Sequence, residues 1–183
     1  IYGADFESWV ELIKLPNLYE GGSRPGHFKG VSTVVTILFN LVEPDFAVFG
    51  EKDFQQLRII ETMVKDLKMN IEILRGPTVR EADGLAMSSR NVKLSKETRE
   101  IAPEIFKALS LMQDAVKKGE SLSSVLWQAA RSQLAKFPDI EVDYLSIVRE
   151  KDLISVNQLE SSCRVLFAGY LNKIRLIDNL RLF

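Results

Sequence analysis

The chain has 183 residues, a length that fits one domain or two small ones. Its 24 basic residues nearly balance its 25 acidic residues, and the net charge of −1 argues against a broad surface for nucleic acid or membranes. A hydrophobic fraction of 46% and a charged fraction of 27% exclude intrinsic disorder. We therefore expect a folded protein with no nucleic acid and no membrane partner, although a local basic pocket for a small anion stays compatible with this composition.

One cysteine, Cys163, and one histidine, His27, limit the metal and disulfide chemistry of the chain. They exclude an intramolecular disulfide and a structural zinc site built from Cys and His. No apolar run has the length of a membrane span, and no signal peptide opens the chain. These features predict a cytoplasmic protein. The first residue is Ile1 rather than Met, which fits a processed protein or a piece of a longer one.

The first predicted elements are a short helix, a loop and a longer helix. Residues 8–15 are predicted to be helical, because Ser8 and Glu11 have the spacing of a capping box and a proline follows. The glycine-rich stretch 17–30 is predicted to be a loop. Apolar residues then recur at helical spacing over 31–42, up to a second proline.

A strand, a helix and a second strand follow in close succession. The apolar stretch 45–50 predicts a buried strand that ends at Gly50, and a long helix begins at Asp53. Residues 71–74 predict the second strand. This order is typical of a βαβ crossover, which implies parallel strands in a covered sheet.

The second half of the chain predicts a different architecture. Residues 78–92 are polar and weakly periodic, and we expect a loop or hinge there. Beyond it the pattern predicts, in chain order, a helix capped by Ser95 over 95–118 that Pro103 can break, a helix capped by Ser121 over 121–137, and strands over 141–148, 165–171 and 174–182. Asn172 and Lys173 form a tight turn between the last two strands. The predicted fold is a parallel α/β part followed by an α+β part.

The strongest candidate site is the segment Gly50-Glu51-Lys52-Asp53, where a parallel strand ends and a helix begins. Ligands of open α/β sheets bind at that end of the strands, and the N–H groups of a helix N-terminus suit phosphate. Lys52 can neutralise phosphate charge, and Asp53 can hold a phosphate-bound Mg²⁺. In the alternative interpretation, Asp53 merely caps the helix and Gln56 completes a capping pair.

Two further segments carry groups that can bind anions. They are Met87-Ser88-Ser89-Arg90 and Arg24-Pro25-Gly26-His27. The first places two hydroxyls and a guanidinium in a loop that can bind polyphosphate, and the second places a guanidinium and an imidazole beside a fixed turn. The alternative interpretation of each segment is an ordinary polar surface loop. The chain has neither a dinucleotide-binding glycine motif nor a P-loop, and it shows no Ser/His/Asp or Cys/His arrangement.

Taken together, four segments in one order identify a resemblance. They are Arg-Pro-Gly-His-Phe-Lys-Gly (24–30), Phe-Gly-Glu-Lys-Asp-Phe-Gln-Gln-Leu (49–57), Arg-Glu-Ala-Asp-Gly-Leu-Ala-Met-Ser-Ser-Arg-Asn (80–91) and Arg-Leu-Ile-Asp-Asn (175–179). In these segments the chain resembles the pantothenate synthetase family, the AMP-forming pantoate–β-alanine ligases. The resemblance extends from about residue 17 to the C-terminus.

The resemblance implies a fold and an activity. The implied fold class is α/β, with a Rossmann-like nucleotidyltransferase sheet (residues 1–79, incomplete in its N-terminal part) and a small α+β C-terminal lid domain (residues 80–183). The implied reaction uses ATP and Mg²⁺ to join pantoate to β-alanine through a pantoyl-adenylate, which releases pyrophosphate and then AMP. Enzymes of this family are usually homodimers.

The resemblance also implies roles for particular residues. ATP-binding residues would be Gly50, Glu51, Lys52, Asp53, Val79, Met87, Ser88, Ser89 and Arg90, with Val79 contacting adenine through its backbone and Asp53 lying near Mg²⁺. Lys52, Ser88, Ser89 and Arg90 would serve catalysis. Gln56 would bind pantoate, and Arg24 and His27 would line the active site.

One family motif has no counterpart here. The first nucleotide motif of the family, Met-x-x-Leu-His-x-Gly-His, is absent from the chain. We therefore expect this chain to be inactive alone. Two alternatives stay open: a related nucleotidyltransferase that activates another carboxylate, and a non-catalytic association fragment.

Overall fold

The computed structural model describes residues 1–183, which divide into two compact units, 1–77 and 78–183. We describe each unit by itself. No helix of either unit has both the length and the apolar character that crossing a membrane requires.

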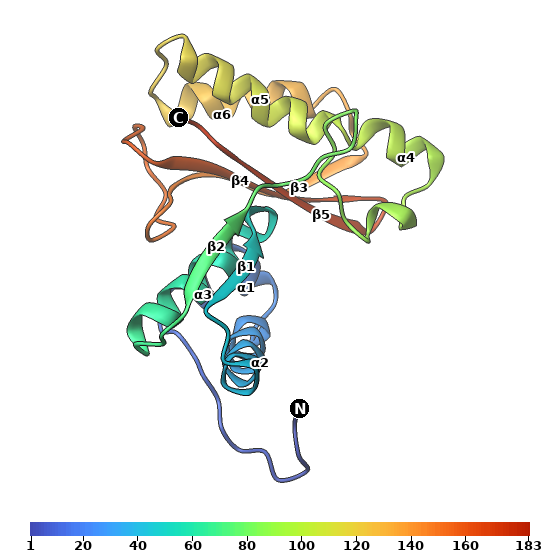
Figure 1. Cartoon of the computed structure of the whole chain (residues 1–183). Coiled ribbons are helices and arrows are strands. Elements are labelled where there is room, and N and C mark those ends of the chain that lie inside the picture. The colour runs from blue at the N-terminus through green and yellow to red at the C-terminus, as the bar shows by residue number, and fades with distance from the viewer. The chain divides into compact units, whose positions relative to one another are not determined.

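The first unit is built around a βαβ crossover (Figure 1). Its elements are the 3₁₀ helix Leu15–Asn17, α1 (Tyr19–Ser23), α2 (His27–Val42), β1 (Phe46–Gly50), the 3₁₀ helix Glu51–Asp53, α3 (Phe54–Asp66) and β2 (Glu72–Gly76). Strands β1 and β2 pair in parallel, from Phe46 opposite Glu72 to Gly50 opposite Gly76. The predicted crossover is confirmed, but the predicted burial of the first strand is wrong, since Phe46 and Val48 of β1 are exposed.

Helices α2 and α3 pack on one face of this two-stranded sheet. Val35 of α2 and Ile60 and Met63 of α3 form a small core, against which Phe49 and Ile73 of the strands pack. The opposite face carries Phe46, Val48 and Leu74, which are 59%, 68% and 39% exposed. The first unit therefore has an apolar sheet face that remains open, which we call the bare face.

The predicted helix over residues 8–15 is wrong. This segment has no regular structure before the 3₁₀ helix, because tertiary contacts replace local ones. The backbone N–H of Val10 donates to Thr33 Oγ1 at 3.0 Å, and the centroid of the Trp9 ring lies 5.0 Å from Lys29 Nζ. A capping box cannot compete with these contacts.

The predicted loop over residues 17–30 is also partly wrong, since it contains α1 and the first turn of α2. The cause is Gln55, a buried side chain of α3. Its amide donates to the carbonyl oxygens of Leu15 and Leu18 at 2.8 and 2.7 Å, and its oxygen accepts from the N–H of Glu20 at 3.0 Å. These three bonds satisfy the backbone at the start of α1, which the sequence pattern of residues 17–30 does not reveal.

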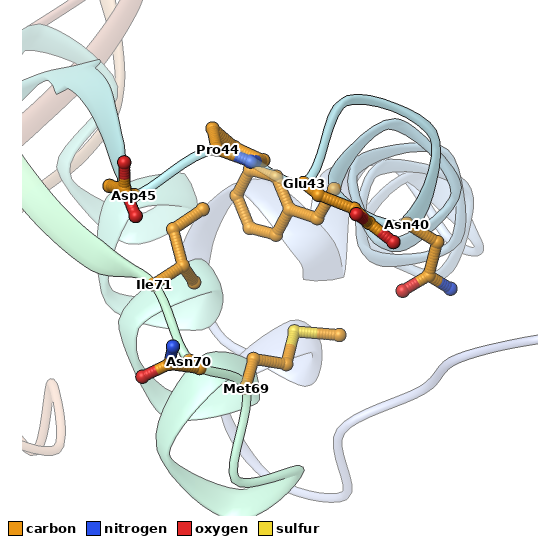
Figure 2. Close-up of a pocket in the computed structure, with 8 residues that line it drawn as sticks. Asn40, Glu43, Pro44, Asp45, Met69, Asn70 and Ile71 are labelled. Atoms are coloured by element: carbon orange, nitrogen blue, oxygen red, sulfur yellow. The ribbon is translucent and has the colours of Figure 1, made fainter.

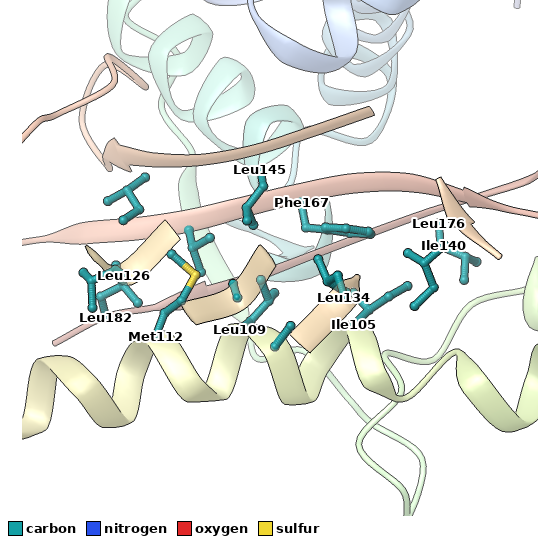
Figure 3. Packing of buried hydrophobic residues seen from close by; sticks show 14 of the residues in the cluster. Ile105, Leu109, Met112, Leu126, Leu134, Ile140, Leu145, Phe167, Leu176 and Leu182 are labelled. Atoms are coloured by element: carbon teal, nitrogen blue, oxygen red, sulfur yellow. The ribbon is translucent and has the colours of Figure 1, made fainter. Parts of the chain in front are cut away.

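The second unit packs helices on one face of an antiparallel sheet. Its elements are the 3₁₀ helix Asn91–Lys93, α4 (Lys96–Ile101), α5 (Glu104–Lys117), α6 (Ser123–Leu134), β3 (Ile140–Arg149), β4 (Cys163–Leu171) and β5 (Ile174–Arg181). The strand order is β3-β4-β5. Figure 3 shows the core between the helices and the sheet, where Leu109 and Met112 of α5 meet Leu126 of α6 and Phe167 of β4. Cys163 is buried in the same core.

Most boundaries of the second unit follow the predictions. The Ser95 hydroxyl accepts from the N–H of Thr98 at 3.3 Å, and the predicted break near Pro103 separates α4 from α5. The tight turn is confirmed, since Asn172 and Lys173 both have positive φ, 46° and 69°. One cap is wrong: α6 starts at Ser123, because Ser121 is held by a backbone bond from Leu159 instead.

Candidate functional site

The carboxyl end of the parallel sheet lacks side chains on both strands. Gly50 ends β1 and lies opposite Gly76, which ends β2. Gly50 has φ −71° and ψ 132°, a conformation open to any residue, and a Cβ atom built there would have no neighbour within 4 Å. Neither backbone strain nor packing requires glycine at position 50. The space beside it leaves the end of the sheet accessible to a ligand.

The turn after Gly50 carries the predicted charged residues. Glu51, Lys52 and Asp53 form a single 3₁₀ turn that leads into α3. Lys52 is mostly buried, and its Nζ lies 3.8 Å from Asp53 Oδ1, while the Asp53 side chain is half exposed. Asp53 occupies the N-cap position of α3 without a side-chain hydrogen bond to the helix, so the alternative capping interpretation is wrong. The half-exposed carboxylate thus pairs with Lys52 and does not cap the helix.

Two adjacent glutamines of α3 have different surroundings. Gln55 is buried and makes the three backbone bonds described above. Gln56 is half-buried, one turn from the 3₁₀ segment. The structure thus assigns Gln55 to the fold and leaves Gln56 as the glutamine that can face a ligand.

Arg24 and His27 lie at the corner between α1 and α2. Gly26, at the N-cap of α2, has φ 79°, and the chain turns there. Arg24 is exposed, while His27 is half-buried and packs against Phe28 with ring centroids 5.0 Å apart.

The second unit presents its predicted residues on a hairpin and on the turn that follows it, rather than on an irregular loop. The hairpin comprises residues 79–87: Arg80 and Ala86 form a β-bridge, and the N–H of Met87 donates to the Val79 carbonyl at 2.9 Å. Val79 and Met87, predicted separately as nucleotide-binding residues, are therefore direct neighbours at the open end of the hairpin. Both side chains are at least half exposed.

Ser88, Ser89 and Arg90 form the turn that leaves the hairpin. The Ser88 hydroxyl accepts from the N–H of Arg90 at 3.2 Å, and the Ser88 carbonyl accepts from the N–H of Asn91 at 3.0 Å. The Asn91 amide also donates to the Ala86 carbonyl at 3.1 Å. Ser89 is exposed and Arg90 half-buried, so both reach the surface from a defined backbone.

One electrostatic contact stabilises the tip of the hairpin. The Arg99 guanidinium donates to Asp83 Oδ2 at 2.6 Å, and this hydrogen bond holds the pKa of the Asp83 carboxyl below its usual value. Asp83 also accepts from the N–H of Leu85 at 3.2 Å. The tip is therefore fixed by a charge pair at its surface.

Sequence reasoning assigned no role to Arg80 or Asp178, although both belong to segments that carry the resemblance. In the structure the Arg80 guanidinium forms a bidentate pair with the Asp178 carboxylate. They are 98 residues apart in sequence, so spacing alone gives no signal of this contact.

A cavity of about 490 Å³ lies at the other end of the parallel strands (Figure 2). It is lined by Phe39, Asn40, Glu43, Pro44, Asp45, Met69, Asn70 and Ile71. Asp45 and Ile71 directly precede β1 and β2, so the cavity opens at the amino ends of the strands. None of the predicted site residues lines it.

No group of three or more His, Cys, Asp or Glu side chains that could hold a metal ion is present. A nucleotide-bound Mg²⁺ needs only one or two protein carboxylates, because phosphates and water complete its shell. Asp53, exposed beside a mostly buried lysine, fits that more modest requirement.

Comparison with known proteins supports one family throughout. A family model described as pantoate-beta-alanine ligase matches residues 1–181. The chain is 47% identical over 178 residues to a pantothenate synthetase of Shewanella sediminis and 46% identical over 184 residues to that of Thermus thermophilus. These alignments cover 97% and 100% of the chain, but only 63% and 66% of the relatives. The chain thus spans just under two thirds of the length of these relatives.

Solved structures agree with the sequence comparisons. The crystal structure of pantothenate synthetase from Thermus thermophilus superposes with a TM-score of 0.96 at 44% identity, covering 100% of this chain and 66% of that one. A pantoate-beta-alanine ligase from Francisella tularensis, solved with beta-gamma ATP and beta-alanine, gives a TM-score of 0.69 at 31% identity, covering 96% and 59%. The predicted α/β fold class is confirmed.

Proposed function

Because the chain belongs to the pantoate–beta-alanine ligase family, we propose that it carries residues for the ATP-dependent condensation of pantoate with β-alanine. The observation that supports this most directly is the carboxyl end of the parallel sheet. Two paired glycines leave its backbone open, and a mostly buried lysine lies two residues beyond the first of them. The related Francisella protein was solved with an ATP ligand and β-alanine, which fits this chemistry.

The proposed reaction has two displacement steps. A pantoate carboxylate oxygen attacks the α-phosphorus of ATP, the bond to the β-phosphate oxygen breaks, and pyrophosphate leaves. The β-alanine amine then attacks the carbonyl carbon of the adenylate, loses a proton, and AMP leaves with the electron pair of the broken bond. Positioning and charge neutralisation supply most of the catalysis in such transfers.

We assign the phosphate contacts to two sets of residues. In the first unit, the Lys52 ammonium neutralises phosphate charge while the N–H groups that follow Gly50 donate to phosphate oxygens. In the second unit, Ser88, Ser89 and Arg90 donate from their hydroxyls and guanidinium, and Val79 and Met87 contact the adenine. Asp53 would hold Mg²⁺, which supplies additional neutralisation of the phosphates when bound.

Gln56 is our proposed pantoate-binding residue, because its amide can both donate to a carboxylate and accept from a hydroxyl. Arg24 and His27 would line the same substrate region. We further propose a cytoplasmic homodimer as the form in which the complete enzyme acts. A related enzyme that activates a different carboxylate would share the ATP residues but not a dependence on Gln56.

The test is to titrate the 183-residue chain with ATP in the presence of Mg²⁺ and to measure the affinity for ATP by isothermal calorimetry. Lys52→Met should weaken ATP binding about tenfold or more, since a charge-assisted contact to phosphate is lost. Lys65→Met, near the far end of the same helix, is the matched control and should leave the affinity unchanged. Absence of ATP binding by the unsubstituted chain, or equal binding by Lys52→Met, would contradict the proposal.

A turnover assay tests the proposal that this chain is inactive by itself. The chain contains no Met-x-x-Leu-His-x-Gly-His segment, so we propose that it forms no pantothenate by itself. Pantoate, β-alanine, ATP and Mg²⁺ are incubated with the chain, and pantothenate is measured by mass spectrometry. Sustained product formation would reject the proposed inactivity but support the proposed reaction.

A further inference from the structure

We propose that Arg80 and Asp178 act together as a clamp that positions Ser88, Ser89 and Arg90. The clamp would do so by fixing the hairpin of residues 79–87 to strand β5. This inference rests on the proposed function only for its ligand, ATP. The clamp itself is a feature of the second unit alone.

The clamp has the geometry of a strong ion pair. Arg80 Nη1 donates to Asp178 Oδ2 at 2.7 Å and Nη2 donates to Asp178 Oδ1 at 2.9 Å. The Asp178 side chain is 5% exposed and that of Arg80 17%. Asp178 Oδ1 also accepts from the N–H of Asn179 at 2.7 Å. A bidentate ion pair with so little access to water has one preferred geometry. Removing either side chain would leave the other charge buried without the partner it has in this pair, which is unfavourable.

The same guanidinium also binds the hairpin directly. Arg80 Nη1 donates to the Gly84 carbonyl at 3.1 Å, across the hairpin from its own backbone. The guanidinium carbon lies 3.8 Å from the centroid of the Phe106 ring on α5. Arg80 therefore connects three elements of the second unit: the hairpin, helix α5 and strand β5.

Gly84 shows how closely the hairpin approaches α5. It has φ +92°, and a Cβ atom at this position would lie 2.5 Å from Phe106 Cδ1. Glycine is thus required both by the backbone conformation and by the contact. The tip of the hairpin and the Arg80 side chain are fixed on the same aromatic ring.

This order extends to the proposed phosphate-binding turn. The bonds from Met87 N–H to Val79 and from the Asn91 amide to Ala86 connect the turn to the hairpin at both of its ends. Ser88, Ser89 and Arg90 lie between these two bonds. If the hairpin detaches, the turn loses its fixed ends, and the fraction of molecules with the donors in place falls. Apparent affinity falls in proportion to that fraction.

The test compares amide hydrogen exchange and ATP affinity in the 183-residue chain. Asp178→Asn keeps the shape of the side chain but removes its charge, and it should speed exchange of the Gly84 and Met87 amides about tenfold or more, because the hairpin opens locally. Gly84→Ala should have the same effect without touching the ion pair. Both variants should weaken ATP binding by a similar factor, and ATP should no longer protect the Ser89 and Arg90 amides.

Arg149→Gln is the matched control. Arg149 is an arginine of strand β3 in the same sheet, and it pairs with Asp152 and Glu160. This variant should lower the stability of the unit while leaving the relative exchange of residues 81–91 unchanged. Should Asp178→Asn fail to fold, Arg80→Lys, which keeps the charge but loses the bidentate contact, takes its place.

The outcomes separate the clamp from the proposed function. Unchanged hairpin exchange in Asp178→Asn and Gly84→Ala would overturn the clamp, as would a loosened hairpin with full ATP affinity. If the unsubstituted chain does not bind ATP, the proposed function fails and the positioning role for ATP fails with it. The exchange data would still decide whether Arg80 and Asp178 fix the hairpin.

Discussion

Gln55 and Gln56 illustrate what single residues can and cannot reveal from sequence. The two residues are adjacent and chemically identical. From the sequence, only the family resemblance indicates which of them binds a ligand. The structure separates them physically, since Gln55 satisfies two carbonyls and one N–H of the 3₁₀ and α1 segments. The partners lie 35 to 40 residues away, beyond the range of local patterns.

Because Gln55 is buried and Gln56 is partly exposed, substituting each by leucine gives a matched pair of variants for measuring stability. Gln55→Leu should lower the free energy of unfolding by about 2 kcal/mol or more, because it leaves buried backbone groups without partners. Gln56→Leu should change it by less than about 0.5 kcal/mol, as a partly exposed site usually does. Urea denaturation measures both. Equal losses would show that Gln55 is not specifically structural.

Asp152 gives a prediction for the effect of pH. Three bonds from the Arg149 guanidinium hold the pKa of this carboxyl below its usual value. The unfolded chain then binds a proton that the folded chain does not, so stability rises with pH in this range and is lost as pH falls through the folded pKa. Below about pH 4, Asp152→Asn should show a shallower dependence of unfolding free energy on pH than the unsubstituted chain. Identical slopes would contradict the prediction.

At the scale of elements, local patterns succeed where an element is defined by its own residues. The βαβ crossover and the turn at Asn172 and Lys173 were predictable because apolar spacing and turn chemistry act within a few residues. Residues 8–15 fail for the opposite reason. Their capping signal is real but weak, and contacts of Val10 and Trp9 with α2 outweigh it.

The turn between β4 and β5 also contains a correctable strain. Lys173 has φ 69°, which costs a residue with a Cβ about 1 kcal/mol. Lys173→Gly should therefore stabilise the second unit by up to about 1 kcal/mol, less the added backbone entropy of the unfolded chain. Lys118→Gly, at a helix C-cap with φ −88°, is a control that should give no gain. Thermal unfolding measures the stability of both variants. A loss of stability in Lys173→Gly would contradict the prediction that the backbone is strained at Lys173.

At the scale of the whole molecule, the bare face of the first unit is the feature that composition does not indicate. Parallel sheets are normally covered on both faces, yet Phe46 and Val48 are more than half exposed. The average hydrophobic content of the chain cannot reveal this face, because composition does not say which apolar residues are exposed. The alternative hypothesis that the chain is a non-catalytic association fragment rests on this exposed face.

We expect the bare face to promote self-association of the 183-residue chain. Sedimentation velocity should show a sedimentation coefficient that rises with concentration, and Val48→Lys should reduce this rise. Leu111→Lys, on an apolar residue of α5 in the second unit that is 40% exposed, serves as the control. A monomer at all concentrations would count against association.

The division after Pro77 has a practical consequence for spectroscopy. The chain has two tryptophans, and each unit contains one: Trp9 near Lys29 in the first, and Trp127 in the second, where its indole N–H donates to the Leu145 carbonyl at 3.1 Å. Removing either indole leaves a fluorophore that reports on one unit alone. Emission from two single-tryptophan chains can therefore distinguish one cooperative melting event from two, without any label attached to the protein.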